Sequence, residues 1–228
     1  MLSTALTRNA AGMMALIILG TATFLVVCYS SLPWLLPVHF RLDGIANGWQ
    51  YKTFARVMLP FFIQLALALT LGGIGALLLS RVDGRHEPHR PDMKAAATAA
   101  EAVVLFALIW VAFQSYTAVA LVRMWTTERA GLGRVYVLLE VIGLALTGVV
   151  GVRAHVRLGR PDPRPYVPEH WRLGQLYRNP DDPALFVPSR HGSQWTLNFG
   201  RPAAVVLLGL ILAAGVAGPT AIIVLALR

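Results

Sequence analysis

The sequence predicts an all-α integral membrane protein, a bundle of five transmembrane helices with a short aromatic segment on the cytoplasmic side. Of its 228 residues, 56% are hydrophobic and only 14% are charged, whereas soluble domains average about 25% charged residues. The mean hydropathy of +0.60 agrees with this assignment. Five stretches are apolar over about 20 residues, the length that crosses roughly 30 Å of hydrocarbon. This composition excludes a disordered chain, a secreted disulfide scaffold and an ordinary cytosolic enzyme.

The five apolar stretches are almost free of charge, and we expect each to form one transmembrane helix. They are residues 10–36, 57–80, 95–122, 135–152 and 202–227. The third is interrupted only by Glu101 and the fourth only by Glu140. The first is longer than the apolar region of a signal peptide, and no small-x-small cleavage site follows it. We therefore interpret it as a retained anchor.

These stretches divide the chain into four parts. Residues 1–94 hold the first two helices and an outer loop, residues 95–152 the third and fourth helices, residues 153–201 a cytoplasmic segment, and residues 202–228 the fifth helix. The prolines of the cytoplasmic segment exclude one long helix, yet the segment is too aromatic for a flexible linker. It is too short to build a core alone, so we expect it to dock on the inner helix ends or to lie among lipid headgroups.

The distribution of basic residues predicts the orientation. Lys and Arg collect on the cytoplasmic loops of inner-membrane proteins, and a cytoplasmic N-terminus places 13 of the 20 Lys and Arg residues inside and 7 outside. We therefore expect a multi-pass protein of the bacterial inner (plasma) membrane, with its N-terminus in the cytoplasm and its C-terminus outside. The positive-inside pattern accounts for the excess of basic residues, so no direct contact with nucleic acid is expected.

One motif surrounds the first outer loop. It consists of Leu32-Pro33, Pro37-Val38-His39-Phe40, Gly44, Trp49 and Lys52, with Pro60 beyond them. This motif resembles the domain-of-unknown-function 1648 family over residues 20–67. The family includes the immunity protein for the sporulation-delaying toxin of bacilli, so the resemblance implies a bacterial plasma-membrane protein. It further implies recognition of a toxin and sequestration of a cytoplasmic repressor, but the relatives' C-terminal membrane region is absent here, and immunity is one candidate among several.

A second motif lies in the cytoplasmic segment. It consists of Trp171, Gly174, Tyr177, Asn179-Pro180-Asp181-Asp182-Pro183, Phe186-Val187-Pro188, Arg190, Gly192, Trp195-Thr196 and Asn198-Phe199. This motif is similar to the domain-of-unknown-function 5808 family over residues 171–203. It is the more specific of the two, because many fixed residues recur in order.

The outer loop carries the first candidate ligand-binding residues, which are His39, Phe40, Asp43, Asn47 and Trp49. His39, with Asp43 four residues later, could titrate near neutral pH or bind a metal or a peptide. The alternative is that His39 and Asn47 only fix the loop by hydrogen bonds. Two ligands are too few for zinc, which takes three or four protein ligands, so neither a metal nor another cofactor is expected.

A polar layer within the helices completes this candidate site. At 1.5 Å per residue from the outer helix ends, Gln64, Gln114, Ser115 and Glu140 share a level about 10 Å beneath the outer surface. Ionisable residues in membrane helices usually face the bundle interior. We therefore expect Glu140 either to be neutral and hydrogen-bonded to Gln114 or to line a water-filled pocket under the His39 loop.

The inner helix ends carry a second charged group. Glu101 lies near the inner end of the third helix, and we expect it to reach toward Lys94 or to pair with Arg153 or His155 in a structural role. Arg153 and Arg157 extend the fourth helix into the inner interface. Anchoring to anionic lipid is the simplest interpretation of these two arginines.

The cytoplasmic segment carries the candidate partner-binding residues. They are Trp171, Tyr177, Asn179, Asp181, Asp182, Arg190 and Trp195. Paired aspartates could bind a divalent cation or a partner's arginine. Turn chemistry is the alternative, because Asn and Asp side chains bond their own backbone.

These observations favour a membrane protein that acts by binding over an enzyme. No catalytic motif for hydrolases, metalloproteases or nucleotide-binding enzymes is present. Its expected partners are the lipid bilayer, a peptide toxin or lipid outside, and a cytoplasmic protein inside, in an immunity or signalling role. Two alternatives remain open. The first is a small transporter or an accessory subunit of a transport complex, and the second is a membrane enzyme that uses His39 or the Asp181–Asp182 pair.

Overall fold

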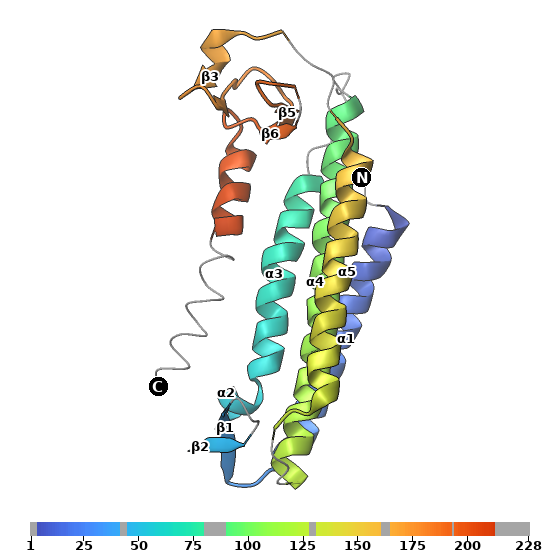
Figure 1. Cartoon of the computed structure of the whole chain (residues 1–228), viewed down its shortest axis with the longest axis vertical. Helices are drawn as coiled ribbons and strands as arrows, with labels where there is room; N and C mark the ends of the chain where they lie inside the picture. The colour runs from blue at the N-terminus through green and yellow to red at the C-terminus, as the bar shows by residue number, and fades with distance from the viewer. Residues whose placement is uncertain are drawn as a thin grey trace. The chain divides into compact units, whose positions relative to one another are not determined.

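The computed structural model describes residues 4–41, 45–79, 90–127, 131–160, 165–192 and 194–212. It is mostly helical, with short paired strands (Figure 1). The helices are α1 (Ala5–Tyr29), α2 (Phe54–Val57), α3 (Leu59–Leu79), α4 (Arg90–Thr127), α5 (Arg134–Leu158), the 3-10 helix η1 (Pro168–His170) and a short apolar helix over Pro202–Leu212. The strands are β1 (Leu35–Phe40), β2 (Ala46–Tyr51), β3 (Trp171–Arg172), β4 (Leu176–Tyr177), β5 (Phe186–Pro188) and β6 (Trp195–Leu197).

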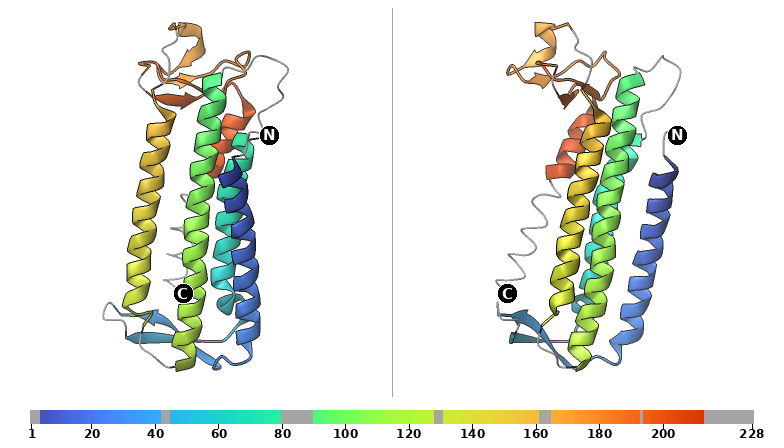
Figure 2. Two further views of the ribbon diagram at one scale, coloured as in Figure 1. Left: turned by 90° about the vertical axis from the view of Figure 1, so that its right-hand side faces the viewer. Right: turned by 45° about the vertical axis from the view of Figure 1, so that its right-hand side comes forward.

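Four helices, α1, α3, α4 and α5, are long and apolar enough to cross a membrane, and Figure 2 shows them from two further directions. This confirms the mostly helical fold, with helices of membrane-spanning length and apolarity on the first four predicted stretches. Of the predicted fifth span, only Pro202–Leu212 is described, and at 1.5 Å per residue this helix is too short to cross a bilayer by itself. Residues 213–228 lie outside the described residues, so the fifth span stays a prediction.

The first predicted helix ends earlier than the hydropathy indicates. α1 stops at Tyr29, and the last two residues of the predicted span, Leu35 and Leu36, belong to β1 instead. Pro33 cannot donate a backbone hydrogen bond and does not continue a helix. The Ser31 hydroxyl donates to the Cys28 carbonyl oxygen at 2.8 Å and satisfies one acceptor of the last turn. Hydropathy measures apolarity alone, so it does not separate the end of a membrane helix from an apolar strand.

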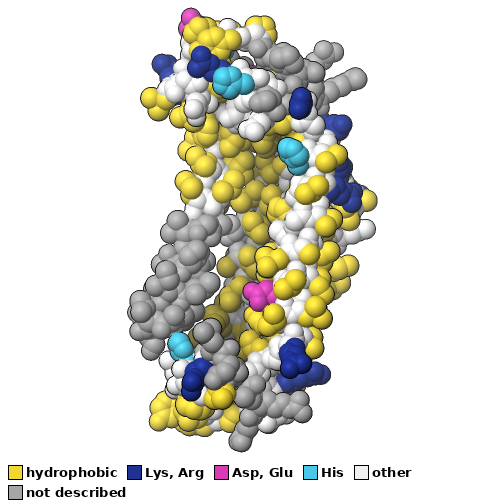
Figure 3. Space-filling view, viewed as in Figure 1, with side chains coloured by type: hydrophobic (Ala, Val, Ile, Leu, Met, Phe, Trp, Pro, Cys, Tyr) yellow, Lys and Arg dark blue, Asp and Glu magenta, His cyan; other side chains and the backbone are white. Residues whose placement is uncertain are grey.

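The described chain divides into two compact units, and α3, α4 and α5 contribute residues to both. The first unit comprises residues 1–5, 73–103 and 152–228, and the second comprises residues 6–72 and 104–151. In the second unit, buried side chains of α1 and α4 form an apolar cluster of Ala10, Met14, Val104, Ala107 and Val111. In the most apolar part of α4, half of the residues are buried, whereas in the most apolar part of α5 only 6% are buried. α4 is therefore the central helix, and α5 keeps an outward apolar surface (Figure 3).

The hairpin of β1 and β2 belongs to the second unit. Its strands are antiparallel, with Pro37 opposite Trp49 and His39 opposite Gly48, and the register shifts on both sides of His39. A Cβ atom at position 48 would lie 2.8 Å from the His39 Cβ, closer than packed carbon atoms approach. Glycine at position 48 is therefore what lets the two strands pair beside His39.

Replacement of Gly48 with alanine tests this requirement. We expect the hairpin to lose its register, at a cost of about 1–3 kcal/mol for forcing in one methyl group. Because the exposed Trp49 follows directly, the change will alter the near-ultraviolet circular dichroism of the purified protein. Asn47→Ala, at the exposed neighbouring position, is the matched control and should leave the spectrum unchanged. A Gly48→Ala spectrum identical to the wild type would contradict the assigned register.

The first unit contains two small antiparallel hairpins, β3–β4 and β5–β6. Residues 173–175 connect β3 and β4, and the Gln175 backbone N–H donates to the Arg172 carbonyl oxygen. The two central residues of this β-turn, Leu173 at φ 50° and Gly174 at φ 73°, have the left-handed conformation that a type I′ turn requires. The prediction that prolines exclude one long helix in this region is confirmed. We call residues 165–201 the connector.

Candidate functional site

The β1–β2 hairpin presents an exposed aromatic and polar surface. Trp34 is 70% exposed, Trp49 is 54% exposed and Tyr51 is 65% exposed, and the rings of Trp34 and Tyr51 lie 6.2 Å apart. His39 and Asn47 are exposed as well. Of the five residues predicted for this surface, three are therefore accessible. Asp43 and the side chain of Phe40 lie outside the described residues.

The same hairpin is fixed to the helices at its base. The Trp125 indole Nε1 donates to the Pro37 carbonyl oxygen at 3.0 Å, and Leu36 is fully buried. The Lys52 ammonium donates to the Tyr29 and Leu32 carbonyl oxygens at 3.1 and 2.9 Å. A cation at the carboxyl end of a helix is stabilised by the helix dipole. The exposed aromatic surface therefore sits on a fixed base.

The second unit also contains a buried polar cluster around Gln64. The Gln64 side chain is fully buried, and its Nε2 donates to the Thr21 hydroxyl at 3.1 Å and to the Val111 carbonyl oxygen at 2.9 Å. The Thr21 hydroxyl lies 3.1 Å from that of Ser115. Gln64 and Ser115 therefore meet through Thr21, which the sequence analysis did not single out. A threonine in an otherwise apolar helix gives no local signal of such a role.

Glu140 does not join this cluster. It is exposed on α5 and forms no hydrogen bond or ion pair with Gln114. The Gln114 Oε1 atom is buried without a hydrogen-bond partner among the described residues. Most residues of α5 are not buried against other helices. A residue on this helix can therefore lie at the same level along the helix axes as Gln64 and still point away from it.

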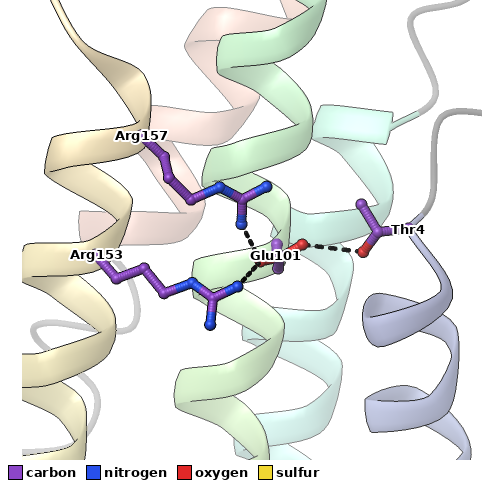
Figure 4. A network of polar contacts seen from close by, with 4 residues as sticks. All are labelled: Thr4, Glu101, Arg153 and Arg157. Atoms are coloured by element: carbon purple, nitrogen blue, oxygen red, sulfur yellow. Dashed lines mark hydrogen bonds and ion pairs between the residues drawn. The ribbon is translucent and has the colours of Figure 1, made fainter.

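In the first unit, the Glu101 carboxylate joins three segments of the chain (Figure 4). Glu101 is only 5% exposed. Oε2 accepts a hydrogen bond from the Thr4 hydroxyl at 3.0 Å, while Oε1 accepts from the Arg157 guanidinium and lies 3.7 Å from Arg153 Nη2. Pairing with Arg153 is one of the predicted alternatives. The contacts with Arg157 and Thr4 were not expected.

The polar residues of the connector are engaged in turns. Asn179 Oδ1 accepts from the Asp181 backbone N–H at 3.0 Å, and Asp182 Oδ1 accepts from that of Ala184 at 2.9 Å. The Tyr177 hydroxyl donates to Asp182 Oδ2 at 3.1 Å. These contacts are the turn chemistry that the sequence analysis held as an alternative to cation binding. In the described part of the chain, no group of three or more His, Cys, Asp or Glu residues is placed to hold a metal ion.

A cavity of about 220 Å³ opens on the connector. Its walls include the predicted partner residues Trp171, Tyr177 and Arg190, together with Tyr166 and His170. The Arg190 guanidinium lies 4.9 Å from the centre of the Tyr166 ring. Three predicted residues are thus brought together at one place.

The other predicted partner residues lie elsewhere in the connector. Asn179, Asp181, Asp182 and Trp195 do not line the cavity. The Trp195 Nε1 atom is buried without a partner in the described residues. The predicted set is therefore not one continuous surface.

Comparison with protein families matches both motifs. Residues 16–63 match the domain of unknown function DUF1648, and residues 180–205 match the family of unknown function DUF5808. The two resemblances stated from the sequence are confirmed, with slightly different limits. No curated protein and no solved structure matches the chain. Both families are uncharacterised, so the matches identify segments of the chain without assigning an activity.

Proposed function

We propose that this protein is a multi-pass protein of the bacterial inner membrane that acts by binding. Its outer hairpin takes up an amphipathic peptide, and its connector engages a cytoplasmic protein. The observation that carries the proposal is the exposure of Trp34, Trp49 and Tyr51 on a fixed hairpin, with the exposed Asn47 at an alternate position of the same strand as Trp49 and Tyr51. Aromatic side chains supply most of the energy of many binding surfaces, and a fixed base reduces the entropy lost on binding.

The number of predicted spans between them supports opposite positions for the two surfaces. The helices α3, α4 and α5 lie between the hairpin and the connector in the sequence. When an odd number of membrane-spanning helices lies between two loops, the loops are on opposite sides of the membrane. The positive-inside pattern then assigns the connector to the cytoplasm and the hairpin to the exterior. A ligand bound outside and a partner held inside fit an immunity or signalling protein.

The interior of the second unit favours binding over transport. A transporter of polar substrates needs polar side chains along its path. On α4, the buried residues between Glu101 and Gln114 include Val104, Ala107 and Val111, and these pack against Ala10 and Met14 of α1. Apolar packing of this kind leaves no line of polar groups along α4.

Selection of peptides on the reconstituted protein tests the proposal. The full chain is placed in lipid nanodiscs, and a phage-displayed peptide library is selected against it after depletion on empty nanodiscs. We expect enriched peptides whose affinity falls at least about tenfold, or roughly 1.4 kcal/mol, in Trp49→Ala.

Tyr166→Ala, which removes an exposed aromatic side chain of the connector, is the matched control and should bind these peptides like the wild type. Failure to enrich any peptide above empty nanodiscs would overturn the proposal. Equal loss of affinity in both variants would show that the hairpin is not the site.

A further inference from the structure

The charges around Glu101 do not cancel. One carboxylate faces two guanidinium groups, those of Arg153 and Arg157, so one positive charge is left over. Among the described residues, no second Asp or Glu forms an ion pair with either arginine. An uncompensated cation next to a buried carboxylate calls for a further anion.

The two arginines also keep most of their hydrogen-bond donors. A guanidinium carries five N–H groups, and both arginines approach the same Glu101 oxygen, Oε1, because Oε2 accepts from Thr4. The Arg153 side chain is 59% exposed and that of Arg157 is 41% exposed. Their outer edges are therefore open to a second acceptor, while the buried Glu101 holds their inner edges.

Apolar side chains lie next to these arginines on the same helix. Val152 is 66% exposed and Val156 is 71% exposed, one residue before Arg153 and Arg157 respectively. Exposed valines beside exposed guanidiniums suit the boundary between acyl chains and headgroups, where arginine stems lie along apolar surface and their heads reach polar groups. A free anion in water would use the arginines but would gain nothing from the valines.

We propose that Arg153 and Arg157 bind the phosphate of an anionic phospholipid, with its acyl chain along Val152 and Val156. Glu101 is a positioning residue that fixes both guanidiniums toward the headgroup. Guanidinium groups bind phosphate oxygens through two parallel N–H bonds. This site is separate from the outer hairpin and does not depend on what the hairpin binds.

Thermal unfolding of the full chain in a zwitterionic detergent tests the proposal. Phosphatidylglycerol is titrated in, with phosphatidylcholine of the same acyl chains and inorganic phosphate in parallel. We expect phosphatidylglycerol alone to raise the unfolding midpoint, by about 3–8 °C at saturation. A rise of the same size with phosphatidylcholine or with inorganic phosphate would overturn the proposal.

Four variants locate the effect. Arg153→Gln/Arg157→Gln is expected to lose the rise, and Arg134→Gln, at the other end of α5, to keep it. Arg153→Gln alone, which removes only the looser ion pair, should lose part of the rise and remain folded. Glu101→Gln should lower the starting midpoint and shift the rise to higher phosphatidylglycerol concentrations, because both guanidiniums remain but are no longer fixed toward the headgroup. If phosphatidylglycerol raises the unfolding midpoint of the double variant as much as that of the wild type, the arginines do not bind the lipid.

Discussion

Replacement of Asn198 with alanine is expected to unfold the connector while the long helices stay intact. The Asn198 side chain is fully buried, and its hydrogen bonds join residues 179–184 to residues 198–200. Its Oδ1 accepts from the backbone N–H groups of Asn179 and Gly200 at 3.0 and 2.9 Å. Its Nδ2 lies within 2.8 to 3.1 Å of the carbonyl oxygens of Asn179, Asp182 and Ala184.

The size of the effect follows from the groups that alanine leaves behind. Each buried backbone group that loses its partner costs about 1–3 kcal/mol, and Asn198 serves several at once. In the described part of the connector, a small apolar cluster of Tyr177, Ala184 and Val187 with Trp171 opposes this loss. We therefore expect a cost of about 3 kcal/mol or more, enough to open so short a segment.

Limited trypsin digestion measures the outcome. Cleavage after Arg178 and Arg190 should become rapid in Asn198→Ala, while far-ultraviolet circular dichroism keeps its helical intensity. Gln194→Ala, which removes an exposed amide side chain from the same segment, is the matched control and should keep wild-type protection. Wild-type protection in Asn198→Ala would show that the amide does not hold the connector together.

The sequence predicts the helices well because hydropathy is a local property. The four long helices fall on the first four apolar stretches. Gln64 and Ser115, two of the four residues that depth along the helices places at one level, both hydrogen-bond to Thr21. Rotation about each helix axis is not local. A helix that is apolar on all sides has no polar face to fix its rotation, so Glu140 was expected inside and is exposed on α5.

Side-chain partners were the least predictable part of the candidate sites. Thr4, Thr21 and Lys52 gave no signal in the sequence, yet their hydrogen bonds reach other segments of the chain. Asn198 belongs to the motif that resembles the second family, but the motif alone assigns it no contact. Such roles depend on which segments meet in space, and hydroxyl and amide groups are common enough in loops and helices that their presence indicates little.

Glu101 and Glu140 are each the lone acidic residue of an apolar stretch. The structure separates them. Glu101 is 5% exposed and joined to Thr4, Arg153 and Arg157, whereas Glu140 is exposed and forms no hydrogen bond or ion pair with another described residue. Their removal should therefore differ in cost.

Glu101→Ala is expected to destabilise the protein by about 2–3 kcal/mol, below the 3–5 kcal/mol typical of a broken buried ion pair, because water can reach the exposed edges of Arg153 and Arg157. For a chain of this size the unfolding midpoint in detergent should fall by about 5–10 °C. Glu140→Gln should change stability by no more than about 0.5 kcal/mol, as surface substitutions do. Equal costs for the two variants would mean that the contacts around Glu101 do not hold Thr4, α4 and α5 together in the folded protein.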